Sequence, residues 1–145
     1  MQLNAKTYGH DPYHFLLQNN FIPENIKINY CRTVESILKK IDNAFQFREN
    51  IEYIRLHGDC HASNILWRDE GLHIVDLDDC LMGPAIQDIW MLLSGNVEQV
   101  RMQLDHILNG YCEFHDYNPQ ELHLIEPLGF DLDDLKDSHL HFSLD

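Results

Sequence analysis

Three short runs typical of β-strands lie in the middle of this 145-residue chain, with helix-type sequence on both sides. They cover residues 53–57, 64–67 and 72–77 and are rich in β-branched and aromatic side chains. The second and third flank Arg68-Asp69-Glu70-Gly71, a good turn sequence, so we predict a hairpin there. The pattern predicts an α+β fold, mostly helical around a short β centre.

Apolar residues recur at helical spacing on both sides of this centre. Thr33 is the expected N-cap of one helix, and Gly95 is the expected stop of another. Asn118-Pro119 indicates a further capped start, which Pro127 and Gly129 interrupt. The predicted helices cover residues 11–17 with proline near the start, 33–47, 84–94 and 97–114.

The charge is strongly acidic, with 24 Asp and Glu against 10 Lys and Arg and a formal net charge of −14. This balance argues against a nucleic-acid partner and against an anionic membrane surface, which would need clustered basic residues. No apolar run approaches the roughly 20 residues of a membrane span. Four cysteines without a C-x-x-C pair indicate free, buried thiols in a reducing cytoplasm.

Polar residues crowd the ends of the β-type runs. One group is His57-Gly58-Asp59-Cys60-His61-Ala62-Ser63-Asn64, and the other is Asp76-Leu77-Asp78-Asp79. Gathered carboxylates repel one another and are costly to desolvate, a conflict that a divalent cation removes. Carboxylate and amide oxygens are hard ligands that suit Mg²⁺, which usually shares its shell with phosphates.

The spacing of these residues is that of phosphoryl-transfer enzymes, in which a catalytic-loop Asp precedes a metal-binding Asn by five residues. Asp59 and Asn64 stand at that separation, and Asp76 would complete the metal site from a later strand end. Asp59 would face the attacking hydroxyl, while Asn64 and Asp76 would hold the metal against the phosphates. Positioning and charge neutralisation would then dominate catalysis.

These segments resemble the aminoglycoside phosphotransferase and choline kinase superfamily. The resemblance rests on His57-Gly58-Asp59-x-x-x-x-Asn64, on Ile74-Val75-Asp76 and on Gly83-Pro84-x-x-x-Asp88. Within the superfamily, the sequence is most similar to a bacterial group of cytoplasmic Ser/Thr protein kinases, the stress response kinase A group. That similarity is strong from about residue 53 to 108 and weaker on either side.

The resemblance implies the mostly helical C-terminal lobe of a protein-kinase-like fold. It also implies that ATP and Mg²⁺ are used to phosphorylate a protein Ser/Thr or a small hydroxyl substrate. Asp59 would be the catalytic base, and Asn64 and Asp76 the Mg²⁺ and nucleotide ligands, with a second-metal or structural role open for Asp78. His57 and Asp88 would be structural supports, and His61 is open between a scaffold role and a substrate contact.

Such an enzyme also needs a strand lobe that covers the nucleotide, ahead of the catalytic loop. Gly9 is the single glycine before Gly58, so no glycine-rich phosphate loop fits there. We therefore expect the N-terminal strand lobe to be absent, and residues 1–128 to be a catalytic-lobe fragment that is inactive or weak alone. A partner could supply that lobe. Residues 129–145 are an acidic tail foreign to the family, expected to be a solvated surface.

Three alternatives stay open on the sequence alone. Asp59 and Asn64 could simply cap a turn. The chain could be a non-catalytic binding module or half of a split kinase. It could also be a metal-dependent phosphoesterase, because His57, Asp59 and His61 would share one face if they lay on a strand.

Overall fold

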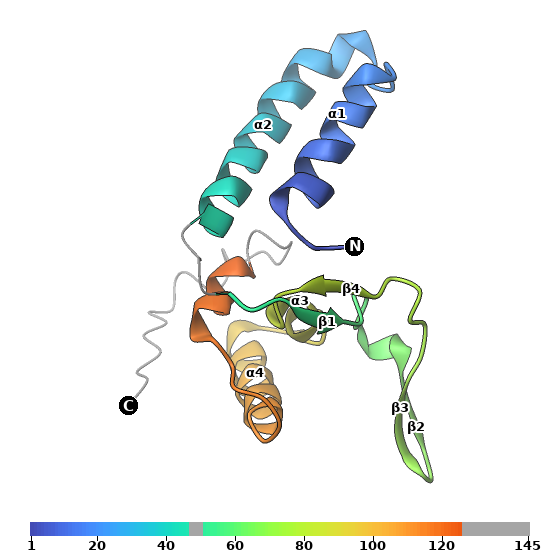
Figure 1. The fold of residues 1–145 in the computed structure, drawn as a ribbon, viewed down its shortest axis with the longest axis vertical. Helices are drawn as coiled ribbons and strands as arrows, with labels where there is room; N and C mark the ends of the chain where they lie inside the picture. Colours follow the sequence, from blue (N-terminus) through green and yellow to red (C-terminus); the bar gives the residue numbers. More distant parts are fainter. Residues whose placement is uncertain (47–50, 126–145) are drawn as a thin grey trace.

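The computed structural model describes residues 1–46 and 51–125, and its architecture is α+β and mostly helical, as predicted (Figure 1). In the described part of the chain, none of the helices combines the length and apolar character needed to cross a bilayer. In chain order the elements are η1 (Lys6–His10), α1 (Asp11–Gln18), α2 (Glu24–Gln46), β1 (Ile54–Leu56), η2 (Ala62–Asn64), β2 (Ile65–Arg68), β3 (Gly71–Ile74), β4 (Leu81–Gly83), α3 (Ile86–Trp90), α4 (Val97–Tyr111) and η3 (Pro119–Leu124).

The helices α1 and α2 lie side by side as an antiparallel pair (Figure 1). His10 Nε2, at the end of η1, lies 3.0 Å from Asp42 Oδ1, and the Tyr13 hydroxyl of α1 donates to Glu35 Oε1 over 3.0 Å, so polar contacts join the N-terminal helical segment to α2 at two points. Thr33 was predicted to cap α2, and that prediction is wrong. The helix begins nine residues earlier, at Glu24, where the Pro23 carbonyl accepts the N–H groups of Ile26 and Lys27 at 3.1 Å each.

Two separate antiparallel sheets form the β centre. β1 pairs with β4, with Leu56 opposite Leu81. The N-terminal residues run along the other edge of β4, where the Leu3 N–H donates to the Met82 carbonyl over 2.7 Å. The sequence did not predict β4, a three-residue strand whose partners lie far away along the chain.

The second sheet is the predicted hairpin of β2 and β3. Ile65 pairs with Ile74, and Arg68 pairs with Gly71 across a loop of the two residues Asp69 and Glu70. The hairpin extends away from the helices (Figure 1). Its side chains are mostly exposed, so its pairing is held mainly by the ladder itself.

The main core lies between α3, α4 and η3. Helix α3 ends at Trp90, so the predicted stop at Gly95 is wrong: Gly95 lies in the connection just before Asn96, which caps α4. Asn96 and Gln99 form a reciprocal capping box, which fixes the start of α4 at Val97. The buried members of this core are Ala85, Ile86, Ile89, Leu93, Val100, Leu104, Leu124 and Ile125.

Several expectations fall at the edges of the described structure. Residues 126–145, which include Pro127, Gly129, the boundary at 128 and the acidic tail, lie outside the described residues. Within residues 1–46 the secondary structure is helical apart from one isolated β-bridge, so this described stretch holds no strand lobe. All four cysteines are free as predicted, but only Cys60 is buried; Cys31 and Cys80 are half-buried, and Cys112, directly after the end of α4, is exposed.

Candidate active site

Residues 57–64 form a loop that leaves β1 and ends in the 3-10 turn η2. The Asp88 carboxylate on α3 accepts the first two N–H groups of the loop. His57 N–H donates to Asp88 Oδ2 over 2.7 Å, and Gly58 N–H donates to Oδ1 over 3.0 Å. Hydrogen bonds to a charged acceptor are stronger than neutral ones, so this contact fixes the path of the backbone into Asp59.

The His57 ring lies buried between the loop and the end of β3. Its Nδ1 accepts the Asp59 N–H over 3.3 Å, and its Nε2 lies 2.8 Å from the Val75 carbonyl oxygen. Since a carbonyl can only accept, Nε2 is the ring nitrogen that donates, and Nδ1 is the one that accepts. His57 thus ties the loop to the residue that precedes Asp76.

Gly58 brings the second polar segment against the loop. Its φ of +91° is in the left-handed region, and a Cβ built there would lie 2.2 Å from the Asp79 carbonyl oxygen. No residue with a side chain fits without a shift of the backbone. The sequence motif therefore has a steric reason for glycine at this position.

The predicted pair Asp59 and Asn64 is in direct contact. Asn64 is buried, and its Nδ2 donates to the Asp59 carbonyl over 2.9 Å and lies 3.4 Å from Asp59 Oδ2. His61 Nε2 lies 3.2 Å from the same carboxylate oxygen, and Ser63 Oγ lies 2.7 Å from His61 Nδ1. Sequence reasoning missed Ser63, although its two-residue step from His61 is a signal that a tight turn would bring them together.

A backbone hydrogen bond of the residue before it brings Asp76 close to Asn64. The Val75 N–H donates to the Asn64 carbonyl over 3.0 Å, which places the following residue beside the loop. Asp76 has a φ of +63°, unusual for a residue with a side chain and a conformation that costs about 1–3 kcal/mol. Its carboxylate is exposed and makes no side-chain bond to other described residues, and Asp78 and Asp79 are exposed as well.

Two side-chain oxygen donors of this site are of the chemical type that suits a magnesium ion. The Nδ2 of Asn64 is turned towards Asp59, so its Oδ1 is left without a protein donor among the described residues. That oxygen and the Asp76 carboxylate are hard ligands, and Mg²⁺ is commonly held by one or two such groups plus water and phosphate. Across residues 1–46 and 51–125, no three His, Cys, Asp or Glu side chains form a metal-binding group by themselves.

The loop also contains a buried thiol, that of Cys60. Burial raises the pKa of Cys60, and the Asp88 and Asp59 carboxylates raise it further.

Residues 57–61 form a loop and not a strand, so the face that His57, Asp59 and His61 would have shared does not exist. The main geometric reason for a metal-dependent phosphoesterase is thereby removed.

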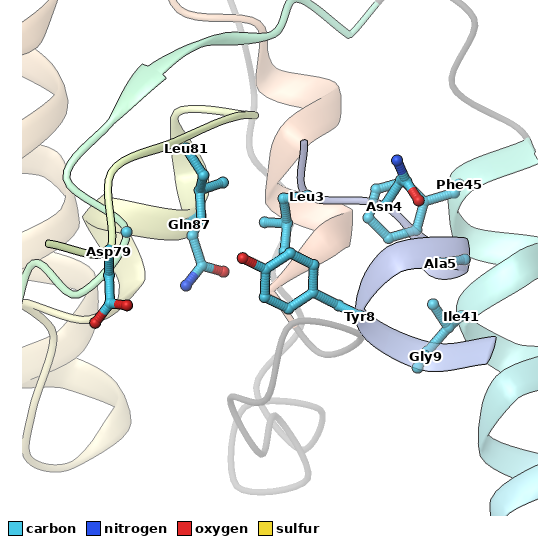
Figure 2. Close-up of a pocket in the computed structure, with 11 residues that line it drawn as sticks. Leu3, Asn4, Ala5, Tyr8, Gly9, Ile41, Phe45, Asp79, Leu81 and Gln87 are labelled. Atoms are coloured by element: carbon cyan, nitrogen blue, oxygen red, sulfur yellow. The ribbon is translucent and has the colours of Figure 1, made fainter. Parts of the chain in front are cut away.

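A cavity of about 330 Å³ adjoins the loop at Gly58 (Figure 2). Gly58 is one of its lining residues. In Figure 2, Asp79, Leu81 and Gln87 lie on one side, and the Tyr8 ring faces Gln87 from the opposite side. Asp59, Asn64 and Asp76 are not among its lining residues. The rest of its lining consists of Leu3, Asn4, Ala5, Gly9, Ile41 and Phe45.

Comparison with known proteins shows the family to which this chain belongs. Residues 34–125 match the family described as "Phosphotransferase enzyme family" (APH), which is more than half of the chain. The chain belongs to this phosphotransferase family. The match covers the loop, both sheets, α3 and α4, so the whole candidate site lies inside the family region. The α+β architecture is accordingly that of part of a kinase-like fold.

Bacterial kinases are among its relatives. The chain is 44% identical over 126 residues to "Stress response kinase A" of Shigella flexneri and 42% identical over the same length to that of Escherichia coli (strain K12). It is 46% identical over 107 residues to "Serine/threonine protein kinase RdoA" of Salmonella typhimurium. The first two alignments cover 87% of this chain but 38% of the relative, and the third covers 74% and 32%. The chain therefore spans well under half the length of these phosphotransferases.

Proposed function

We propose that this chain forms the catalytic-loop lobe of an ATP- and Mg²⁺-dependent phosphotransferase of the Ser/Thr protein kinase type. The observation that carries the proposal is the loop that holds Asn64 against Asp59 and sets Asp76 beside them. The printed names of the bacterial relatives support a hydroxyl of a protein Ser or Thr as the acceptor. The four free cysteines suit a cytoplasmic location.

Each residue has a distinct role in this proposal. Asp59 would face the acceptor hydroxyl and take its proton. Asn64 Oδ1 and the Asp76 carboxylate would hold Mg²⁺, which when bound neutralises the phosphate charge. His57 and Asp88 would keep the loop in place through the backbone bonds described above. Asp78, two residues after Asp76, would either assist with a second ion or have a structural role.

The test is calorimetric titration of the purified chain with Mg·ATP and with Mg²⁺ alone. We expect Asp76→Ala to abolish metal binding, and Asp76→Asn to weaken it while keeping a side chain that tolerates the left-handed backbone. Asp105→Ala, which removes an exposed carboxylate from α4, is the matched control and should bind like the wild type. Unchanged affinity in Asp76→Ala would refute the proposed site.

Phosphate transfer by this stretch of chain alone should be weak, because the described residues include no lobe that covers the nucleotide. A radiolabelled-ATP assay with a generic Ser/Thr acceptor measures it. Robust transfer that disappears in Asp59→Ala would show that a nucleotide-covering lobe is not needed, and would overturn this part of the proposal.

An exposed apolar surface supports a second candidate, a module that binds a strand-rich lobe on the same or another polypeptide. On the β2–β3 hairpin and just after it, six apolar side chains are exposed, and Trp67 is 79% exposed. Surfaces of this kind commonly mark contact sites. The six are Leu66, Trp67, Leu72, Ile74, Val75 and Leu77. Sedimentation of a clean monomer that binds no apolar dye would count against this candidate, whereas dye binding lost in Trp67→Ser would support it.

A further inference from the structure

A buried carboxylate behind the active site has no role in the function proposed above. Glu121 in η3 is 4% exposed, and its Oε2 accepts the Ile86 N–H over 3.0 Å. The Ala85 amide also interacts with this carboxylate. Glu121 therefore holds the first N–H groups of α3, which have no partner inside the helix.

Glu121 holds α3, and α3 also carries Asp88, the residue that binds the loop. Asp88 lies two residues after Ile86, and its carboxylate accepts the His57 and Gly58 N–H groups at 2.7 and 3.0 Å. Helix α3 is only five residues long, so it cannot maintain its own orientation. Ile86 and Leu124 are both fully buried and pack in the same core, so η3 and α3 meet at this point.

The charge of Glu121 is costly where it stands. Burial raises the pKa of its carboxyl and the Glu52 carboxylate adds to this, while the Ile86 and Ala85 amides and His115 act in the opposite direction. A leucine or methionine would fill the same space without that cost. What the carboxylate adds is a directional acceptor at the start of α3.

We infer that Glu121 is a positioning residue, which orients α3 so that Asp88 can hold the catalytic loop. This inference rests on the proposed function for its catalytic meaning. The physical link itself, from Glu121 through Ile86 and Asp88 to the two loop amides, exists in the protein without any ligand.

The experiment is amide hydrogen exchange of the full chain, measured by NMR at His57 and Gly58 without ligand. We expect Glu121→Ala to accelerate exchange at both amides by about tenfold or more, the factor that loss of a charge-assisted hydrogen bond gives. Glu121→Gln keeps an acceptor oxygen and should restore slow exchange. Tyr117→Phe removes a buried hydroxyl that has no partner among the described residues, and it is the matched control in the same segment.

Glu121→Asp, shortened by one methylene, withdraws the oxygen from Ile86 and replaces the Ala variant should that variant fail to fold. Wild-type exchange at His57 and Gly58 in both variants would overturn the inference, and so would equal acceleration in Tyr117→Phe. Affinity for Mg·ATP, measured on the same samples, should fall in Glu121→Asp and return in Glu121→Gln. A wild-type chain that binds no Mg·ATP would refute the proposed function, while the exchange result would still decide the link.

Discussion

Replacing three glycines by alanine, one at a time, separates the two costs that shape the catalytic loop. Gly110 lies within α4 at an ordinary helical position, and a Cβ there meets nothing within 4 Å. Gly71 has a φ of +123° but also has open space around it. Gly58 combines a φ of +91° with the Asp79 carbonyl oxygen 2.2 Å from the position of a Cβ. The series adds first backbone strain and then a clash.

The expected free energies of unfolding follow in that order. Gly110→Ala should stabilise the chain by about 0.5 kcal/mol, because alanine loses less backbone entropy in a helix. Gly71→Ala should destabilise it by about 1–3 kcal/mol, the cost of a left-handed backbone with a side chain. Gly58→Ala should add about 1–3 kcal/mol for overpacking, which gives about 2–6 kcal/mol in total.

Urea unfolding followed by far-ultraviolet circular dichroism measures all three variants against the wild type. Equal slopes against urea would show that the folded and unfolded states are comparable, so the midpoints report stability. If Gly58→Ala were no less stable than Gly71→Ala, the close approach of Asp79 to the loop would not be a real constraint. The steric reason given for the motif glycine would then be refuted.

Three further outcomes follow from single side chains. Because burial raises the pKa of Glu121 above the ordinary 4.5, the folded state keeps a proton that the unfolded state releases. The free energy of unfolding should therefore fall as pH rises from 4.5 through the folded pKa. Urea unfolding of Glu121→Gln at the same pH values should lack this pH dependence. Cys112 is exposed whereas burial raises the pKa of Cys60, so mass spectrometry after brief alkylation should find Cys112 modified first and Cys60 last. Asn96→Ala removes the capping box of α4 and should cost about 1 kcal/mol in urea unfolding, whereas no change would mean that water caps the helix equally well.

Local signals in the sequence predicted the elements that local chemistry determines. The hairpin turn before Gly71 and the start of α4 after Asn96 each depend on a few adjacent residues, and both are where the sequence indicated. The start of α2 was missed because Thr33 is a residue type that commonly caps helices, whereas the helix begins at Glu24, directly after Pro23. β4 was missed because three residues have no periodicity of their own and form a strand only against β1 and the N-terminal residues.

The same difference between local and distant contacts applies to the candidate site. The contact between Asp59 and Asn64 lies within one loop, so its five-residue spacing was visible in the sequence. The left-handed backbone of Asp76 and the approach of the Asp79 carbonyl to Gly58 depend on how two distant segments pack, which no spacing reveals.

The two halves of the site are supported very differently. The loop that carries Asp59 is bonded to Asp88 on α3, and α3 is anchored in the main core through Ile86. Asp76 instead follows an exposed hairpin, and its backbone is in a conformation that costs energy. Asp76 is connected to the loop through the backbone bonds of Val75 to Asn64 and His57, and we expect a cation bound at its exposed carboxylate to stabilise this end of the hairpin further. Of the residues proposed for the site, Asp59 and Asn64 therefore lie on the braced loop, whereas Asp76 lies at the exposed end of the hairpin.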